Sequence, residues 1–174
     1  MSEPIRPAAA PEPAPVAVFD IDGVLADVRH RLCHVRAKPK DWQAFFAAAV
    51  RDQPHPQGLA LLREMARDHD VLLLTGRPEH TRPQTQAWLE SHGVGSYPLH
   101  MRPAGDRRPA AVVKRQFLRG LVRTRAVALV VDDDPVVVET LRAAGFDVHH
   151  ADWERRAEQE QAALLEAQEV DGRS

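Results

Sequence analysis

The stretch VAVFDIDGVLAD, residues 16–27, places two carboxylates, Asp20 and Asp22, directly after an apolar run. Gly23 follows them and permits a tight loop from which both acids can reach one ligand. Two like charges this close raise the pKa of one of the two carboxyl groups. The pair therefore suits a nucleophile or metal ligand beside a general acid or base. Taken alone, it suits equally well two aspartates that cap a turn.

Three further acids, Asp132 to Asp134, follow the apolar run AVALVV. They repel one another unless a cation binds among them, and oxygen-only donors indicate Mg²⁺ rather than zinc. Asp134 precedes Pro135 at the start of a helical pattern, which predicts an N-cap. We therefore expect Asp132 to bind the metal directly and Asp133 to support it or to bind it through water. The alternative is that all three acids only form a turn and a cap.

The apolar run at residues 71–74 is followed by Thr75, Gly76 and Arg77, which predict a turn that ends the strand. The Thr75 hydroxyl and the Gly76 amide can donate to phosphate oxygens, and Arg77 can add a bidentate contact. Lys114, near the start of a helical pattern, can balance the charge of the acids and of a phosphate. Together these groups suit phosphoryl chemistry, although a lysine at a helix start is usually just solvated.

Alternating strands and helices must position these residues. The apolar runs predict strands at 16–20, 71–74, 126–131 and 146–149. Helical patterns lie at 57–68, at 80–92, around 113–121 and around 137–144. Such alternation predicts right-handed crossovers and a mostly parallel sheet, which is an α/β fold. Because ligands bind at the carboxyl ends of parallel strands, we expect Asp20, Thr75 and Asp132 to converge on one crevice.

The alternation divides the chain into a domain and three additions. Residues 1–15 contain five prolines and predict a disordered lead, and residues 16–150 form the domain. Residues 27–56 break the alternation with the amphipathic pattern DWQAFFAAAV and predict a small helical cap over the crevice. Residues 151–174 carry seven acidic and three basic residues and predict an acidic helical tail.

Basic and aromatic side chains in the expected cap bear on the choice of substrate. The basic residues are spaced to meet anions, with a solvated surface as the alternative, and they are His30, Arg31, His34, Arg36 and Lys38. The aromatic residues could stack on a base, but helical spacing favours packing of the cap onto the body, and they are Trp42, Phe45 and Phe46. Trp88 and Trp153 are expected to pack in the domain. Eight Arg or Lys lie between Arg102 and Arg125, where they face an anionic substrate or solvent.

The composition limits the class of protein. A chain of 174 residues, 44% of them hydrophobic, suits one compact domain. The net charge of −2 does not by itself propose a nucleic-acid binder, and the lone Cys33 excludes an internal disulfide. No apolar stretch reaches the roughly 18 residues that a membrane span needs, and no secretory signal is visible. We therefore expect a cytoplasmic protein without a membrane partner.

Four motifs in order resemble the haloacid dehalogenase (HAD) superfamily of phosphotransferases with an aspartate nucleophile. They are DIDGV at 20–24, VLLLT at 71–75, Lys114, and LVVDD at 129–133. Val24 stands where many members have Thr. A narrower resemblance is to the 3′-phosphatase domain of bacteriophage-type polynucleotide kinase–phosphatases, through TGRPE, the segment LHMRPAGDRRPAAVVKRQFL and the closing VVDDDPVVVETLRAAGFDV. The printed sequence contains no GxxxxGK[ST] loop, so the kinase half is not expected in it.

The resemblance implies a Rossmann-like three-layer sandwich and a set of residue roles. Asp20 would form an aspartyl-phosphate, and Asp22 would act as general acid and then as general base. Mg²⁺ would be held by the Asp20 carboxylate, the Asp22 backbone carbonyl and Asp132, with Asp133 nearby. The phosphoryl group would be held by Thr75, Gly76, Arg77 and Lys114.

The resemblance also implies a substrate class. A polynucleotide or nucleotide 3′-phosphate is the favoured phosphomonoester, and a 5′-nucleotidase or a small-metabolite phosphatase is the alternative. A protein that binds phosphate or Mg²⁺ without catalysis is a third interpretation, but it would have no need of Asp22.

Overall fold

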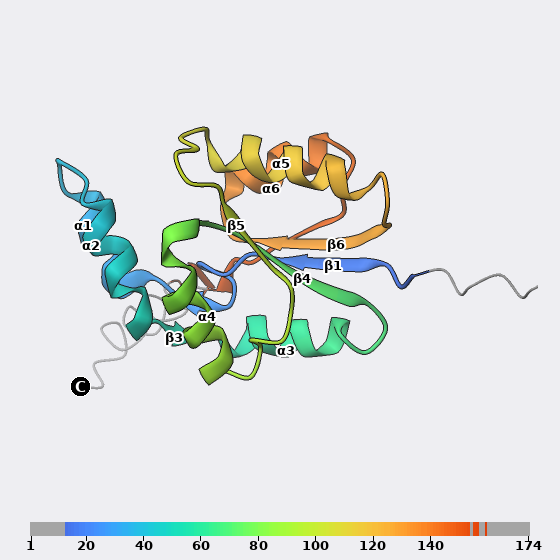
Figure 1. Cartoon of the computed structure of the whole chain (residues 1–174), viewed down its shortest axis with the longest axis horizontal. Coiled ribbons are helices and arrows are strands. Elements are labelled where there is room, and N and C mark those ends of the chain that lie inside the picture. The colour runs from blue at the N-terminus through green and yellow to red at the C-terminus, as the bar shows by residue number, and fades with distance from the viewer. Residues whose placement is uncertain (1–12, 154, 157–158, 160–174) are drawn as a thin grey trace, which may run out of the picture.

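A five-stranded parallel sheet forms the centre of the computed structural model, which describes residues 13–153, 155–156 and 159 (Figure 1). Its strands stand in the order β5-β4-β1-β6-β7. They are β1 (Val16–Phe19), β4 (Asp70–Pro78), β5 (Leu99–Arg102), β6 (Val127–Asp132) and β7 (Val148–His150). All four neighbouring pairs are parallel. The predicted α/β fold with a mostly parallel sheet is therefore confirmed.

Two layers of helices cover the sheet. One face carries α3 (Pro56–Met65) and α4 (Arg82–Ser91), and the other carries α5 (Ala110–Leu121) and α6 (Pro135–Ala143) (Figure 1). Successive residues of β1 point to opposite faces, so Phe19 packs in the core of the first layer and Val18 in that of the second. Burial on both faces explains why the strand is a continuous apolar run and why the architecture is a three-layer sandwich.

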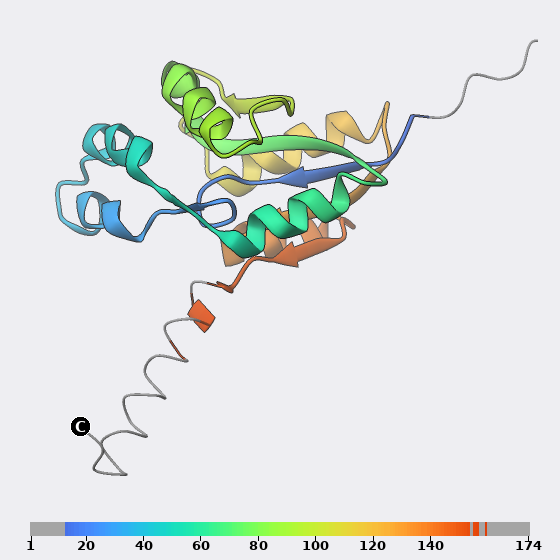
Figure 2. The ribbon, with the colours of Figure 1, turned by 90° about the horizontal axis from the view of Figure 1, so that it is seen from below.

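A helical insertion, residues 26–54, separates β1 from α3 and extends beyond the carboxyl ends of the strands (Figure 2). The short strands β2 (Ala26–Asp27) and β3 (Gln53–Pro54) pair antiparallel at its base. Between them lie η1 (Arg29–Arg31), α1 (Cys33–Arg36), α2 (Trp42–Ala47) and η2 (Ala48–Arg51). The Asp41 carboxylate accepts from the Ala44 amide at 2.8 Å and caps α2. The insertion therefore stands at the edge of the sheet where the expected site residues lie.

Two features of the sheet differ from the prediction. The run Thr75-Gly76-Arg77-Pro78 is the end of β4 rather than a turn that stops it, because Pro78 pairs with Arg102 of β5 and the Arg102 Nε donates to the Gly76 carbonyl at 3.1 Å. The strand β5 itself was not predicted. It is a short edge strand in which only Met101 is fully buried, so its sequence lacks the apolar run of the central strands.

The remaining boundaries agree within a few residues. The four predicted helices are α3 to α6, followed by a short η3 (Glu79–Thr81) before α4, and the weak fourth strand is β7. The expected lead falls mainly on residues 1–12, and the expected acidic tail falls mainly on 154, 157–158 and 160–174, all outside the described residues. Within the described residues, no helix has both the length and the apolar character to cross a membrane.

The predicted cap of α6 is confirmed, because the Asp134 carboxylate accepts from the Val136 amide at 2.8 Å. We expect Asp134→Ala to lower the free energy of unfolding by about 1 kcal/mol, because the amide loses its partner. Urea denaturation measures the change. Asp134→Asn is the matched control, since asparagine caps as well as aspartate. Equal losses in both variants would show that the charge matters rather than the cap.

Candidate active site

Three adjacent strands bring their carboxyl ends together at the centre of the sheet. β1 lies between β4 and β6, so Asp20, Thr75 and Asp132 follow or end neighbouring strands. The Asp20 amide donates to the Val131 carbonyl at 3.0 Å, which fixes the first acid beside the end of β6. All three residues are buried.

Lys114 lies on α5 and contacts both acidic motifs. Its Nζ donates to Asp20 Oδ2 at 2.7 Å and to Asp132 Oδ2 at 2.6 Å, although only 4% of the residue is exposed. Burial would lower the pKa of Lys114, but the carboxylates of Asp20 and Asp132 outweigh burial and hold the pKa above its usual range. The ammonium is therefore charged at neutral pH. The interpretation of Lys114 as a solvated surface lysine is wrong.

Three carboxylates gather around this single ammonium. One oxygen from each of Asp20, Asp132 and Asp133 lies within 4.8 Å of the others. Burial and then the Asp132 charge raise the pKa of Asp20 to about 7 against the opposing effect of Lys114, and burial with both other acids raises that of Asp133 to about 8. This excess of buried negative charge, carried by oxygen donors alone, suits a Mg²⁺ ion. The structure thus places the Asp133 oxygen in the cluster itself.

Gly23 allows Asp133 to approach the loop after β1. Its φ of 72° lies in the left-handed region, and a Cβ there would stand 2.2 Å from Asp133 Oδ2. A side chain at this position would therefore be strained and would displace the third carboxylate of the cluster.

Asp22 stands apart from the acidic cluster, between two guanidinium groups. Arg77 donates to its Oδ1 from Nε at 2.9 Å and from Nη2 at 2.6 Å, and Arg31 donates to the same oxygen at 2.7 Å. Burial would raise the pKa of Asp22, but Arg77 and Arg31 outweigh it and hold the pKa below the ordinary value. The side chain is still 24% exposed, so it remains accessible to a ligand.

A second carboxylate, that of Asp52, accepts hydrogen bonds from the same two arginines. Its Oδ2 accepts from Arg31 at 2.7 Å and from Arg77 at 2.9 Å, and its Oδ1 accepts from Arg31 Nε at 2.8 Å. The Asp52 backbone carbonyl accepts from the indole of Trp88 at 2.9 Å, and its side chain is fully buried. Because Arg31 and Asp52 belong to the helical insertion, the insertion and β4 together hold Asp22 in position.

A family model described as the phosphatase domain of polynucleotide kinase PNKP matches residues 14–153. This chain belongs to that family. It is therefore a phosphatase domain of HAD type. The four motifs of the sequence supply Asp20, Thr75, Lys114 and Asp132. No curated protein matches the sequence.

Solved structures share the fold of this chain. A chain in the structure of the Pnkp1/Rnl/Hen1 RNA repair complex gives a TM-score of 0.66 at 23% identity, over 79% of this chain and 42% of that one. A second structure of the Pnkp1/Rnl/Hen1 complex gives 0.64 at 21% identity, over 84% and 51%. A class C acid phosphatase from Bacillus anthracis with tungstate bound gives 0.52 at 17% identity, over 69% and 52%. This chain thus spans about half of the length of these proteins.

Two of the predicted arginines pair with the same two acids. Arg31 was expected to meet anions or solvent on the surface of the cap, but it is fully buried against Asp22 and Asp52. Arg77 was expected to hold the phosphate directly, and the structure places its guanidinium on the same two acids. Of the other basic residues, His30 contacts Asp52 at 2.8 Å, His34 is half-buried, and Arg36 and Lys38 are exposed.

The remaining predicted residues divide between the site and the core. Thr75 is buried and its hydroxyl accepts from the Arg77 amide at 3.2 Å, next to the half-buried Gly76. Trp88 packs in the core as expected, and Trp153 packs against the same cluster. Sequence reasoning did not find Asp52, because it lies in a loop-like stretch, DQPHP, with no apolar strand before it.

Proposed function

We propose that the domain is a Mg²⁺-dependent phosphomonoesterase that removes the 3′-phosphate of a polynucleotide through an aspartyl-phosphate on Asp20. The observation that carries this proposal is that two acids only two residues apart lie in opposite electrostatic surroundings. Asp20 lies in the acidic cluster with Lys114, and Asp22 lies between Arg31 and Arg77. Two carboxylates held apart in this way can take a nucleophilic role and a proton-transfer role in one reaction.

Hydrogen bonds to both oxygens of the Asp20 carboxylate orient it for attack. The Ile21 amide donates to Oδ1 at 2.7 Å and Lys114 donates to Oδ2. In the first step an Asp20 oxygen forms a bond to phosphorus, and the bond from phosphorus to the ester oxygen breaks with its electron pair. Lys114 and the Thr75 hydroxyl supply positive charge and a donor for the phosphoryl oxygens.

Asp22 moves the proton. Its Oδ1 accepts all three guanidinium hydrogen bonds, so Oδ2 is the oxygen for proton transfer. The arriving phosphate anion raises the low pKa of Asp22, and the protonated carboxyl then gives its proton to the departing alkoxide. The resulting carboxylate takes a proton from the water that attacks phosphorus, which releases inorganic phosphate and restores Asp20.

The acidic cluster fits the metal that this family implies. Asp20, Asp132 and Asp133 would hold Mg²⁺ by their carboxylates, and the backbone carbonyl of Asp22 remains a predicted fourth ligand. When bound, the cation neutralises the non-bridging phosphoryl oxygens and so reduces their repulsion of the anionic nucleophile.

A substrate screen tests the proposed specificity. Phosphate release is measured from 3′- and 5′-phosphorylated oligonucleotides, mononucleotides and sugar phosphates, with Mg²⁺ present. We expect the 3′-phosphorylated oligonucleotide to give the highest kcat/KM. A higher value for a 5′-nucleotide or a sugar phosphate would refute the proposed substrate and favour a 5′-nucleotidase or a metabolite phosphatase instead.

Mg²⁺ is expected to raise the melting temperature of the domain. A ligand that binds only the folded state at 100 times its Kd adds about 2.7 kcal/mol of stability. Asp133→Asn should raise the melting temperature in EDTA, because it removes one of the crowded charges, and should shrink the shift that Mg²⁺ causes. Thermal unfolding in EDTA and in MgCl₂ measures both effects. Asp134→Asn, outside the cluster, should keep the full shift, and an unchanged shift in Asp133→Asn would remove that residue from the metal site.

A further inference from the structure

Three aromatic side chains of α2 have divided roles. Phe45 is buried, and the Arg31 guanidinium lies 4.1 Å from the centre of its ring. Trp42 is 51% exposed, so the expectation that it packs the cap onto the body is wrong. Trp42 and Phe46 stack on each other, with ring centroids 6.0 Å apart and planes 25° apart. Phe45 thus anchors the helix, and Trp42 and Phe46 remain accessible to a ligand.

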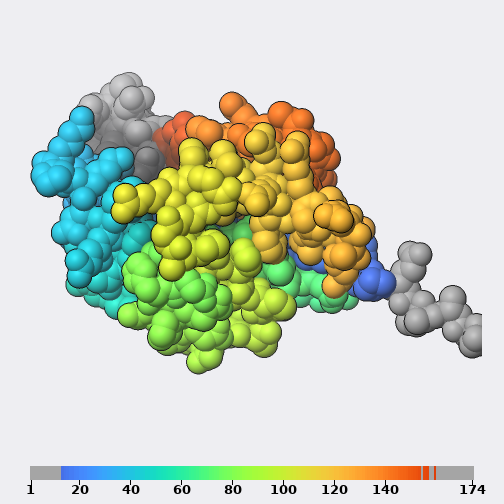
Figure 3. Space-filling view, turned by 45° about the horizontal axis from the view of Figure 1, so that its top comes forward, coloured from blue at the N-terminus to red at the C-terminus, as the bar shows by residue number. Residues whose placement is uncertain are grey.

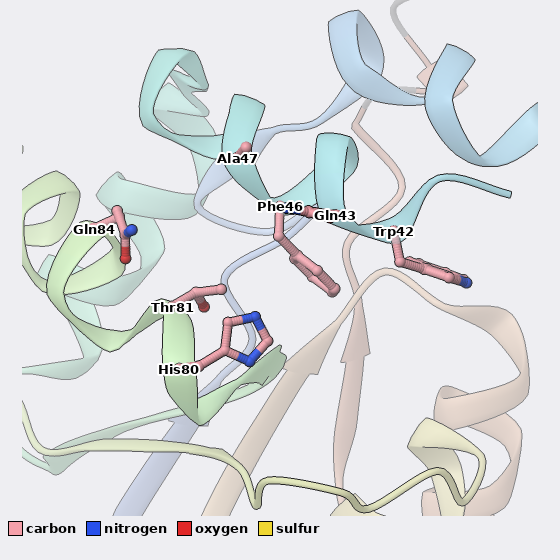
Figure 4. A pocket seen from close by; sticks show the side chains of 7 residues that line it. All are labelled: Trp42, Gln43, Phe46, Ala47, His80, Thr81 and Gln84. Carbon is pink, nitrogen blue, oxygen red and sulfur yellow. The ribbon is translucent and has the colours of Figure 1, made fainter.

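The rings of Trp42 and Phe46 line two clefts. On one side Trp42 and Phe46 line a cleft of about 480 Å³ with His80, Thr81 and Gln84, and Figure 4 shows Phe46 projecting from α2 towards His80. On the other side the same rings line a cleft of about 580 Å³ whose other residues are Gly76, Pro78, Arg102 and the loop from Asp106 to Ala110. In Figure 3 the insertion (cyan) lies next to that loop (yellow).

The second cleft borders the active site at Gly76 and is lined by more positive than negative side chains. Gly76 in its wall stands between Thr75 and Arg77, which contacts Asp22. The cleft is lined by three arginines, Arg102, Arg107 and Arg108, against a single acid, Asp106. Arg107 is exposed, and the Lys40 ammonium lies 5.7 Å from the centre of the Trp42 ring. Positive groups therefore flank the exposed aromatic surface.

We propose that Trp42 and Phe46 form a stacking platform for the bases of a single-stranded 3′ end, whose backbone phosphates face Arg107. This proposal rests on the proposed function for the identity of the substrate. Aromatic rings flanked by cationic groups match a nucleic-acid strand, in which flat bases are joined by charged phosphates. The platform would orient the strand so that its terminal phosphate lies beyond Gly76.

Binding of a strand that has no phosphate to remove tests the platform apart from catalysis. A single-stranded oligonucleotide with a 3′-hydroxyl and a 5′ fluorescein is titrated with the full chain, and its anisotropy is followed. We expect Trp42→Ala to weaken binding about 5- to 100-fold. Trp42→Phe should restore most of the affinity, and Val50→Ala, an exposed apolar residue of the same insertion, should change nothing. Equal binding by Trp42→Ala and the unmodified chain would overturn the platform.

Turnover separates a failure of the platform from a failure of the proposed function. Trp42→Ala should raise KM for the 3′-phosphorylated strand and keep kcat, and it should leave hydrolysis of glycerol 2-phosphate, which has no base, unchanged. A parallel loss on both substrates would overturn the platform, because it would indicate damage to the site. If the unmodified chain leaves the 3′-phosphate in place, the proposed function fails and the binding test alone decides the platform. A dimer that Trp42→Ala dissociates, seen by light scattering, would assign the surface to a second copy instead.

Discussion

Asp20→Asn is expected to lower Mg²⁺-dependent release of phosphate from a 3′-phosphorylated oligonucleotide by about four orders of magnitude or more. The amide keeps the shape of the side chain but cannot act as a nucleophile, and it no longer balances the charge of Lys114, which lies 2.7 Å away. Malachite-green detection of phosphate measures the loss. Asp134→Asn, whose side chain only caps α6, is the matched control and should keep full turnover.

A comparison with Asp22→Asn separates the roles of the two acids. p-Nitrophenyl phosphate has a good leaving group that needs no proton, so this variant should still form the aspartyl-phosphate but hydrolyse it slowly. We expect a rapid burst of about one nitrophenolate per enzyme, followed by turnover lowered roughly 10²- to 10⁴-fold. Asp20→Asn should give no burst. A burst from Asp20→Asn, or appreciable steady turnover, would refute the assignment of the nucleophile.

The sequence predicts the acidic cluster well because each member follows a recognisable element. Asp20 and Asp132 end apolar runs, and in a parallel sheet such ends must lie at one edge. Lys114 is harder to place, since its role depends on α5 directing one side chain under the sheet edge. Asp133 was expected to support the metal or to bind it through water, and the missing side chain at Gly23 leaves room for its carboxylate in the cluster.

The network in which Arg31 and Arg77 join Asp22 to Asp52 could not be predicted from the sequence. Arg31 and Asp52 are 21 residues apart within the insertion. Arg77 belongs to β4 and lies 25 residues after Asp52 in the sequence. Their pairing depends on how the insertion folds back over the sheet, and no local pattern records it. The basic character of Arg31 indicated a surface residue, because arginine is rarely buried unless it is paired. Here two carboxylates provide that pairing.

Asp52→Asn is expected to lower the free energy of unfolding by about 3–5 kcal/mol. The substitution is nearly isosteric, but among the described residues it leaves the buried guanidinium groups of Arg31 and Arg77 with Asp22 as their one carboxylate partner. A buried charge without a partner is costly because it has lost its hydration. Urea denaturation in MgCl₂ measures the change. Asp41→Asn, on the exposed cap of α2 in the same insertion, should stay within about 0.5 kcal/mol of the unmodified chain.

The same variant tests whether Asp52 tunes Asp22 as well as stabilising the fold. With Asp52 neutral, both arginines act on Asp22 alone and lower its pKa further, so it becomes a poorer proton donor. Loss of kcat should therefore be larger for a 3′-phosphorylated strand, whose alkoxide needs the proton, than for p-nitrophenyl phosphate, whose leaving group does not. Both rates are measured below the onset of unfolding. Equal losses on the two substrates would mean that Asp52 only supports the fold, whereas a selective loss assigns the insertion a part in proton transfer.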